Sequence, residues 1–296
     1  MRDETSYQTI APFYDWIMAH VDYDAWGRYL QKVWQKMGVD AKSDVKGASK
    51  SDLKANENHQ SKNLKILELG AGTCPFARRE VYPSEATVIY SDLSPYMLNQ
   101  AHDVAKNNRV AANVLALPFK SSFHLCIMIY DAINYLMDEN DIEKTFQEVF
   151  RLLDENGVFI FDITTEENSK RHFDHAVDYG EMEGCTYFRE SGFDPETKVQ
   201  SNDFIFFVEQ KLSVKQKEKS SLNDDLNSET KPDPKPYRWK KIKENHQQRI
   251  YSIETMRNLA MEAGFIVSGI YEGFTFRAAR DTSERIHFVL RKPPSP

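Results

Sequence analysis

Two glycines and an aspartate have the types and spacing to form a ligand site. Gly70 and Gly72 follow an apolar run, and glycine lets the backbone pass close under a ligand. Pro75 suits the first position of a helix, whose free N–H groups would face a negative group on that ligand. A second apolar run, residues 87–90, leads to Asp92, whose carboxylate can accept hydrogen bonds from both hydroxyls of a ribose. The pattern predicts a nucleoside site, although a plain strand-to-helix connection would show the same two glycines.

The residues around the turn distinguish two kinds of nucleoside site. The dinucleotide fingerprint has a third glycine at its sixth position, where this chain has Pro75. Glu68 stands two residues before Gly70, and the order Glu-Leu-Gly-Ala-Gly-Thr resembles the first motif of class I S-adenosylmethionine (SAM) dependent methyltransferases. Cys74 stands where that motif usually carries a third glycine. A small side chain is tolerated there if its backbone torsions are ordinary.

The resemblance implies SAM as the cofactor and indicates which residues contact it. An aromatic face attracts a cation, which suits the sulfonium of SAM. Asn113 stands where the family usually has an aspartate. Its carbonyl could accept the adenine amino group, or it could be an ordinary polar residue at a strand end. The implied cofactor-binding residues are Tyr14, Trp26, Glu68, Gly70, Ala71, Gly72, Asp92, Leu93, Met97, Asn113, Val114 and Tyr130.

Polar residues at the end of a buried strand predict the reacting side of the site. Residues 123–129 are continuously apolar, as in a parallel strand that is buried on both faces. Open α/β sheets bind ligands at the carboxyl ends of such strands. In the family this edge faces the transferred methyl, so we expect Asp131 and Tyr135 to act at the catalytic centre. Asn134 either joins them or caps the next turn.

A polar strand is the second candidate for binding the methyl acceptor. Residues 179–251 carry antiparallel strand signals, and the last of these strands is strongly polar. Alternation places His246 and Arg249 on opposite faces. On a face toward the cleft, His246 could act as a base or Arg249 could hold a substrate carboxylate, so both are catalytic candidates. The same pattern also suits a solvated edge strand that is kept polar against aggregation.

The other elements must position these residues. Helical patterns follow Ser94 and cover residues 142–153 and 253–263, alternating with apolar runs. This predicts an α/β fold, a doubly wound, Rossmann-like, seven-stranded and mostly parallel sheet with an antiparallel last strand, plus an inserted antiparallel β lid. The expected parts are the N-terminal helices and SAM-binding core (residues 1–177), the lid (178–250), and a C-terminal helix and hairpin that complete the core (251–296). Residues 40–63 and 213–236 are polar and predicted to be flexible loops within these parts.

Composition bounds the partners and the compartment. The chain has 296 residues, and its net charge of −7 argues against a general nucleic-acid binder. Its three cysteines suit free thiols in a reducing compartment and lack zinc-site spacing, so no metal is expected. We find no signal peptide and no apolar run of membrane-spanning length. We expect a cytoplasmic monomer or homodimer that acts on a small molecule, without nucleic acid or membrane as a partner.

The sequence therefore predicts a SAM-dependent methyltransferase that transfers a methyl group to N or O of a small-molecule acceptor. Three alternatives stay open at this point. An NAD-dependent oxidoreductase is disfavoured by Pro75. A nucleoside-binding regulatory protein without catalysis is compatible with Cys74 and Asn113. A nucleic-acid methyltransferase would need a basic stripe, which neither the overall charge nor the lid shows.

Overall fold

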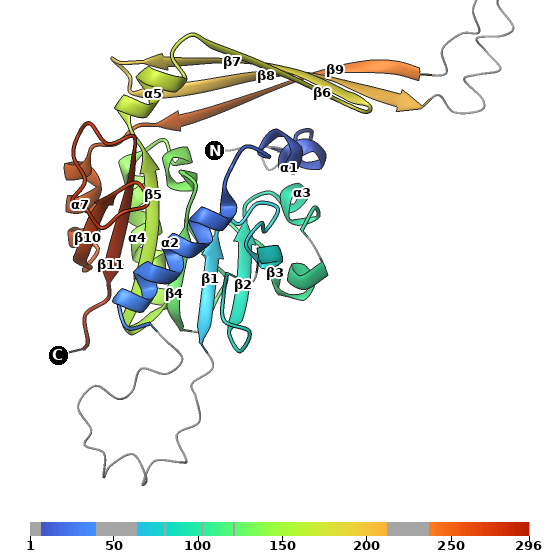
Figure 1. The fold of residues 1–296 in the computed structure, drawn as a ribbon. Helices are drawn as coiled ribbons and strands as arrows, with labels where there is room; N and C mark the ends of the chain where they lie inside the picture. Colours follow the sequence, from blue (N-terminus) through green and yellow to red (C-terminus); the bar gives the residue numbers. More distant parts are fainter. Residues whose placement is uncertain are drawn as a thin grey trace, which may run out of the picture.

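The computed structural model describes residues 7–39, 64–79, 81–101, 103–120, 122–211 and 237–295. The predicted flexible loops 40–63 and 213–236 lie outside the described residues. A large sheet with helices on both faces forms the body of the molecule, and a smaller sheet lies across one end of it (Figure 1).

The large sheet has seven strands in the order β10-β11-β5-β4-β1-β2-β3. Neighbours from β5 to β3 are parallel, whereas β11 is antiparallel to both β5 and β10. The predicted fold, with its antiparallel last strand, is confirmed. Chain order reverses between β1 and β4, which is where open α/β sheets bind ligands. The strands are β1 (Lys65–Leu69), β2 (Thr87–Asp92), β3 (Arg109–Ala111), β4 (Phe123–Met128), β5 (Leu153–Thr164), β10 (Ile266–Glu272) and β11 (Arg285–Arg291).

Helices cover both faces of this sheet because its strands are apolar on both sides. On β1, Ile66 packs with α2 (Tyr23–Lys36), and its neighbour Leu67 packs on the opposite side with α4 (Glu139–Leu152). The Asp22 side chain caps α2 by accepting the Ala25 N–H at 2.8 Å. The last helix, α7 (Ile253–Glu262), begins after Ser252, whose side chain caps it by accepting the Thr255 N–H. The remaining helical elements are η1 (Ala11–Phe13), α1 (Tyr14–Ile17), η3 (Ala77–Arg79), α3 (Pro95–Leu98), η4 (Asp103–Asn108), η5 (Ala132–Tyr135) and α5 (Glu166–His172).

The smaller sheet is the predicted antiparallel lid. Its strands β6 (Ala176–Met182), β7 (Cys185–Asp194), β8 (Val199–Lys211) and β9 (Tyr237–Arg249) are paired in that order. It crosses above the carboxyl ends of the parallel strands, and the N-terminal segment with α1 lies beneath it (Figure 1). The Trp16 ring of α1 packs against Tyr187 of the lid at 5.4 Å between centroids.

Two predicted helices are wrong or shortened. Pro75 does not begin an α-helix, because the chain there makes turns and only the 3₁₀ helix η3. Phe76, Val81 and Tyr82 are buried at a spacing that no single helix face provides, and Pro83 ends the segment. The helix after Ser94 is a single turn, α3, followed by the 3₁₀ helix η4. Within the described part of this segment, no α-helix begins at the glycine turn to bind an anion with its N-terminus.

No described helix is long and apolar enough to cross a membrane. The described residues also hold no cluster of His, Cys, Asp and Glu side chains arranged for a metal ion.

Candidate active site

The glycine turn depends on backbone conformations that favour glycine. Gly70 has φ +62° and Gly72 has φ +56°, both in the left-handed region. A Cβ added at Gly70 would lie 2.9 Å from the Cβ of Ala132, because the turn approaches the segment that follows β4. The Ala71 N–H donates to the Ser91 carbonyl at 3.0 Å, which ties the turn to β2. The turn is thus held between the ends of two strands.

Cys74 also adopts a left-handed conformation, with φ +56°. The condition that its torsions be ordinary is therefore not met, and the residue takes a glycine-like backbone without being glycine. Its side chain is fully buried, and burial raises the pKa of its thiol well above the usual value. A thiol in this environment is inert and serves as packing.

Asp92 fixes the same turn from the end of β2. One carboxylate oxygen accepts the Gly72 N–H at 2.8 Å, and the other accepts the Ser94 N–H at 2.8 Å. A carboxylate oxygen accepts more than one hydrogen bond, so these bonds are compatible with a ribose at the same carboxylate. Met97 closes the turn from below, with its methyl group 3.4 Å from where a Cβ of Gly72 would stand.

Glu68 lies beneath the turn in the protein interior. Its side chain is buried and accepts a 2.6 Å hydrogen bond from the Tyr82 hydroxyl. Burial raises the pKa of Glu68 to about 8, so the carboxyl group is largely protonated at neutral pH. The structure thus places Glu68 where it supports the turn from inside.

The predicted adenine segment follows β3. Asn113 is exposed, and its side-chain oxygen accepts the Leu115 N–H at 3.0 Å. This is a local turn bond, which was the ordinary alternative for that residue. Val114 and Leu93 are half-buried. Contacts of these residues with the adenine stay a prediction.

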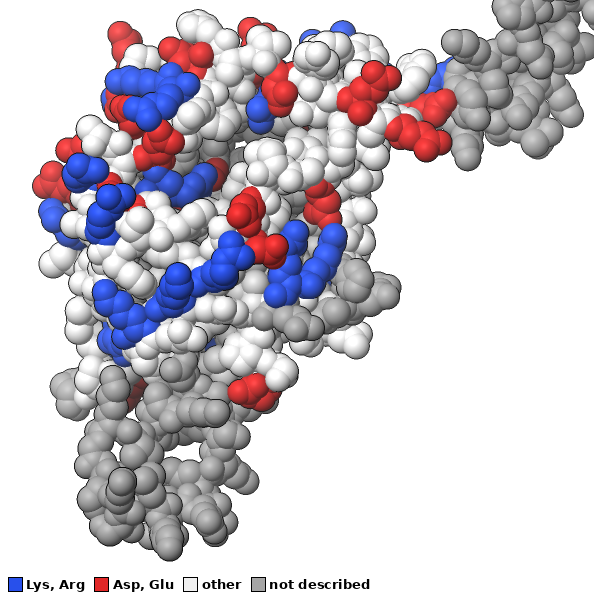
Figure 2. Space-filling model, in the orientation of Figure 1, with Lys and Arg blue, Asp and Glu red and all other residues white. Residues whose placement is uncertain are grey.

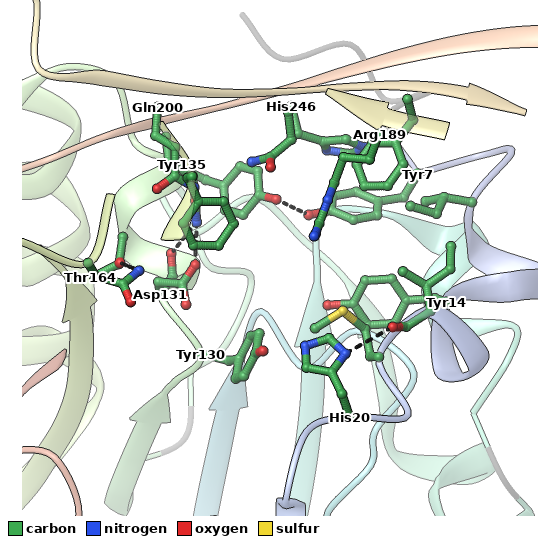
Figure 3. A pocket seen from close by; sticks show the side chains of 18 of the residues that line it. Tyr7, Tyr14, His20, Tyr130, Asp131, Tyr135, Thr164, Arg189, Gln200 and His246 are labelled. Carbon is green, nitrogen blue, oxygen red and sulfur yellow. Dashed lines mark hydrogen bonds between the residues drawn. The ribbon is translucent and has the colours of Figure 1, made fainter. Parts of the chain in front are cut away.

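A cavity of about 130 Å³ lies between the lid and the strand ends (Figure 3). Side chains from the N-terminal segment, the ends of the parallel strands and the loops after them, α5, the inner face of the lid and β11 line it. The polar and aromatic lining includes Tyr7, Tyr14, His20, Tyr130, Asp131, Tyr135, Arg189, Gln200, Phe204, His246, Gln248 and Arg285.

An arginine between two aspartates organises the floor of the cavity. Tyr130 and Asp131 have φ +62° and +50°, and this turn lets the Asp131 N–H donate to Asp162 at 3.1 Å. Arg285 of β11 donates to Asp131 at 2.7 Å and also to Asp162. Its guanidinium lies 5.4 Å from the ring centre of Trp26. Trp26 therefore packs behind this cluster and is not among the residues that line the cavity.

Charge in this cluster is shared among its members. Burial raises the pKa of Asp162 to about 6, and the nearby Arg285 cation opposes that rise. Burial lowers the pKa of Arg285, whereas the negative charges of Asp131 and Asp162 together raise it by more. The net shift of the pKa is upward, so the arginine stays charged. Arg285 and Asp162 were not among the residues expected at the site. Their sequence signal is only that each lies in an expected strand. The two residues come together because β11 pairs antiparallel with β5, with Arg285 opposite Thr164.

Asp131 is also bound from the lid. Gln248 donates to its second carboxylate oxygen, and Gln200 donates to Gln248 at 3.1 Å. Ser169 of α5 donates to Gln200 at 2.9 Å. Because Arg285 and Gln248 both donate to the Asp131 carboxylate, its geometry suits holding the lid and floor in place better than accepting a proton.

Tyr7 and His246 close the cavity on the lid side. The Tyr7 hydroxyl donates to the Tyr135 hydroxyl at 2.6 Å, and the Tyr7 N–H donates to Glu244 at 2.7 Å. The Tyr7 and His246 rings lie 4.6 Å apart, and His246 Nε2 lies 3.2 Å from Glu244 Oε1. No sequence signal distinguishes Tyr7, since aromatic residues are dense throughout the N-terminal segment.

Arg249 lies away from the cavity, on the opposite face of β9 from His246. Its guanidinium donates to the Met137 carbonyl at 3.1 Å and stacks near Tyr251. Its own carbonyl accepts the Asn134 side-chain amide at 2.8 Å. The structure therefore brings together Asp131, Tyr135 and His246, but not Arg249. Catalytic roles for all four stay predictions.

Comparison with known families assigns the central part of this structure. Residues 66–157, from β1 into β5, match the family model described as a methyltransferase domain. Residues 66–157 are a methyltransferase domain. The match covers the glycine turn, Asp92, Asn113 and Asp131. It favours a methyltransferase over the NAD-dependent oxidoreductase and the non-catalytic regulatory protein that the sequence left open.

Relatives of the methyltransferase extend the likeness to the whole chain. A putative methyltransferase of Geobacillus sp. (strain WCH70) is 27% identical over 97% of this chain and 100% of its own. The putative methyltransferase YqeM of Bacillus subtilis (strain 168) is 24% identical, with 97% of each chain covered. A solved SAM-dependent methyltransferase from Clostridium acetobutylicum has the same fold, with a TM-score of 0.68, 20% identity, and 97% and 99% of the two chains covered.

The methyltransferase uses SAM, and the structure fits that cofactor. The left-handed glycines leave room for close backbone approach, Asp92 is anchored at the end of β2, and the aromatic rings of Tyr14 and Tyr130 line the cavity. The recognition made from Glu68, Gly70 and Gly72 is confirmed by the family match and the relatives. Individual contacts with SAM stay predictions.

Proposed function

We propose that this methyltransferase transfers a methyl group to N or O of a small molecule held under the lid. The observation that carries the proposal is the cavity of about 130 Å³ at the carboxyl ends of β4 and β5. A cavity of this size holds about one aromatic ring, which suits a small acceptor and not a macromolecular one.

SAM supplies an electrophilic methyl group on a sulfonium sulfur. The protein positions the acceptor and shields the reaction from water. The lid and the Tyr7 segment cover the strand ends and exclude water, and the rigid floor around Asp131 orients what binds above it. His246 accepts the proton that a hydroxyl or ammonium acceptor loses, and the nearby Glu244 stabilises the imidazolium that forms.

Two solved structures with the same fold support a small acceptor. They are the sugar N-methyltransferase KedS8 from Streptoalloteichus sp., with a TM-score of 0.54, and the amino pentose methyltransferase CalS10 from Micromonospora echinaspora, with a TM-score of 0.51. Each is 16% identical to this chain, so the likeness concerns the fold alone.

A panel of small amines, alcohols and phenols, scored by release of S-adenosylhomocysteine, tests the proposal. Release with at least one compound is expected, and the Asp92→Ala variant serves as the control with a weakened cofactor site. Calorimetry with SAM and NAD belongs to the same test, and only SAM is expected to bind. Methyl transfer to RNA or DNA, with none to any small compound, would overturn the proposal.

A nucleic-acid methyltransferase stays the second candidate because of one surface feature. The exposed face of α2 carries Arg28, Lys32 and Lys36 at intervals of four residues, and Figure 2 shows Lys and Arg in a line across that side of the molecule. Lys36 also lies over the ring of Phe276 at 4.3 Å. Binding of RNA that weakens steeply with salt would favour this candidate.

The predicted cytoplasmic location and monomeric or dimeric state also remain proposals.

A further inference from the structure

Arg189 is the lid residue that points into the cavity with a cationic group. It lies on the inner face of β7, opposite Asp178 of β6 and Phe204 of β8. Figure 3 shows its side chain reaching down from the lid toward Tyr14 and His20. The guanidinium carbon lies 5.9 Å from the ring centre of Phe173 and 6.0 Å from that of Phe204. Two aromatic rings thus flank the cation in the cavity wall.

The hydrogen bonds of Arg189 are incomplete. Its Nη2 contacts Asp178 at 3.1 Å, but Asp178 also accepts a 3.0 Å hydrogen bond from Tyr187. Its Nε is shielded from solvent and has no hydrogen-bond partner within the described part of the chain. A buried donor without a partner costs free energy, so a cationic donor in a binding cavity points to an acceptor that the ligand brings.

The other arginines near the cavity are engaged elsewhere. Arg285 donates to Asp131 and Asp162, and Arg249 donates to the Met137 carbonyl on the far face of β9. Among the arginines of the described ranges that line the cavity, Arg189 alone has a buried donor without a partner.

We propose that Arg189 binds a carboxylate of the methyl acceptor, so that the acceptor is a small ring-bearing acid. The inference rests on the proposed function and specifies its substrate class. A planar guanidinium matches a carboxylate in geometry and in charge. The rings of Tyr7, Tyr14, Tyr135 and Phe204 form walls for a flat apolar ring, and the cavity has room for about one. The sequence pattern offered Arg249 of β9 as the cation for a substrate carboxylate. We assign that role to Arg189 of β7 instead.

Binding of matched acids and amides tests this assignment. The protein is saturated with S-adenosylhomocysteine, and calorimetry measures benzoate and 4-hydroxybenzoate against benzamide and 4-hydroxybenzamide. Each acid is expected to bind about tenfold more tightly than its amide, because only the acid carries the charge that Arg189 recognises. Arg189→Gln should bring the ratio close to one, and Arg189→Lys should restore part of it.

Arg238→Gln is the matched control. It removes an exposed arginine of the same lid, near the start of β9. It should keep the preference for acids, and circular dichroism should show all three variants folded. Equal binding of acids and amides, or no binding of either, overturns the proposal. It also fails if Arg189→Gln weakens SAM binding tenfold while acids keep their advantage, because Arg189 would then hold the carboxylate of SAM.

The outcomes separate this inference from the proposed function. If acids bind through Arg189 but no small compound in the panel releases S-adenosylhomocysteine, the anion site stands and small-molecule methylation fails. If neutral compounds are methylated and acids have no advantage, the proposed function stands and the role of Arg189 is wrong.

Discussion

Asp92 holds the glycine turn as well as facing the cofactor site. If Asp92 only bound the ribose, as the sequence pattern indicates, Asp92→Ala would lower SAM affinity and change stability little. The structure adds a cost, because the Gly72 and Ser94 N–H groups both lose their acceptor. We expect SAM binding to weaken by about 1.5–3 kcal/mol and the free energy of unfolding to fall by about 1–2 kcal/mol.

Calorimetry and urea unfolding measure these two effects separately. Asp92→Asn is the matched variant, since its amide oxygen can still accept one of the two N–H groups, and its loss of stability should be smaller. Unchanged SAM affinity per folded molecule would make Asp92 purely structural.

Glu68 should make the stability of the protein depend on pH. Its pKa is raised from 4.5 to about 8 in the folded state by burial, so the folded protein binds a proton that the unfolded chain releases. Its contribution is fully present below pH 4.5 and is lost as the pH rises through 8. The free energy of unfolding should therefore fall across this window, by up to about 1.4 kcal/mol per pH unit.

Glu68→Gln removes that proton and should flatten the dependence. Urea unfolding of both proteins between pH 5 and pH 8 provides the measurement. At the alkaline end we expect the variant to be the more stable of the two. Parallel pH profiles would show that Glu68 is ionised in the folded protein.

At the scale of elements, Asn134 joins the lid to the core. Its side-chain amide donates to the Arg249 carbonyl at the end of β9, and its oxygen accepts the Thr164 N–H at the end of β5 at 3.0 Å. The side chain is fully buried. The sequence pattern suits Asn134 either as a ligand contact or as a turn cap, whereas in the structure it links two sheets.

Asn134→Ala should lower stability by about 2–4 kcal/mol, because two buried backbone groups lose their partners. Hydrogen exchange should show faster opening at the ends of β5 and β9 than in the centre of the large sheet. Asn140→Ala is a control, since the exposed Asn140 side chain donates to exposed Asp138 in the same turn. Equal small losses in both variants would contradict the link.

At the scale of the whole molecule, the cofactor turn and the lid are separate parts of one site. Asp92 belongs to the large sheet, whereas His246 belongs to the lid and faces the cavity. We expect His246→Ala to raise the acceptor KM or lower kcat, with SAM affinity within about threefold of wild type, or roughly 0.7 kcal/mol. Arg249→Ala should leave both constants near wild type, because its side chain contacts Met137 and Tyr251 instead.

A double-mutant cycle tests the separation. Asp92 lies at the end of β2 in the large sheet and His246 lies in β9 of the lid, so the effects of Asp92→Ala and His246→Ala on kcat/KM should add to within about 0.5 kcal/mol. A larger coupling would show that the lid also positions SAM.

The sequence by itself determined the strands, the glycine turn, Asp92 and the alternation of β9. These features depend on local periodicity and on residues that are close along the chain, such as Gly72 and Asp92, which are 20 residues apart. It also determined the chemistry of the site, since the family motif lies within one strand, turn and strand.

Only the tertiary structure decided which side chains share the cavity. Arg285 and Asp131 are 154 residues apart, and Tyr7 and Glu244 are 237 apart, so no spacing in the sequence relates them. The same applies to Arg189, whose strand pairing aims it inward, whereas Arg249 faces the other way. The left-handed backbone of Cys74 was equally invisible, because the surrounding strand ends impose it against the preference of the residue. Local pattern fixes elements, whereas packing between distant elements fixes the geometry of the site.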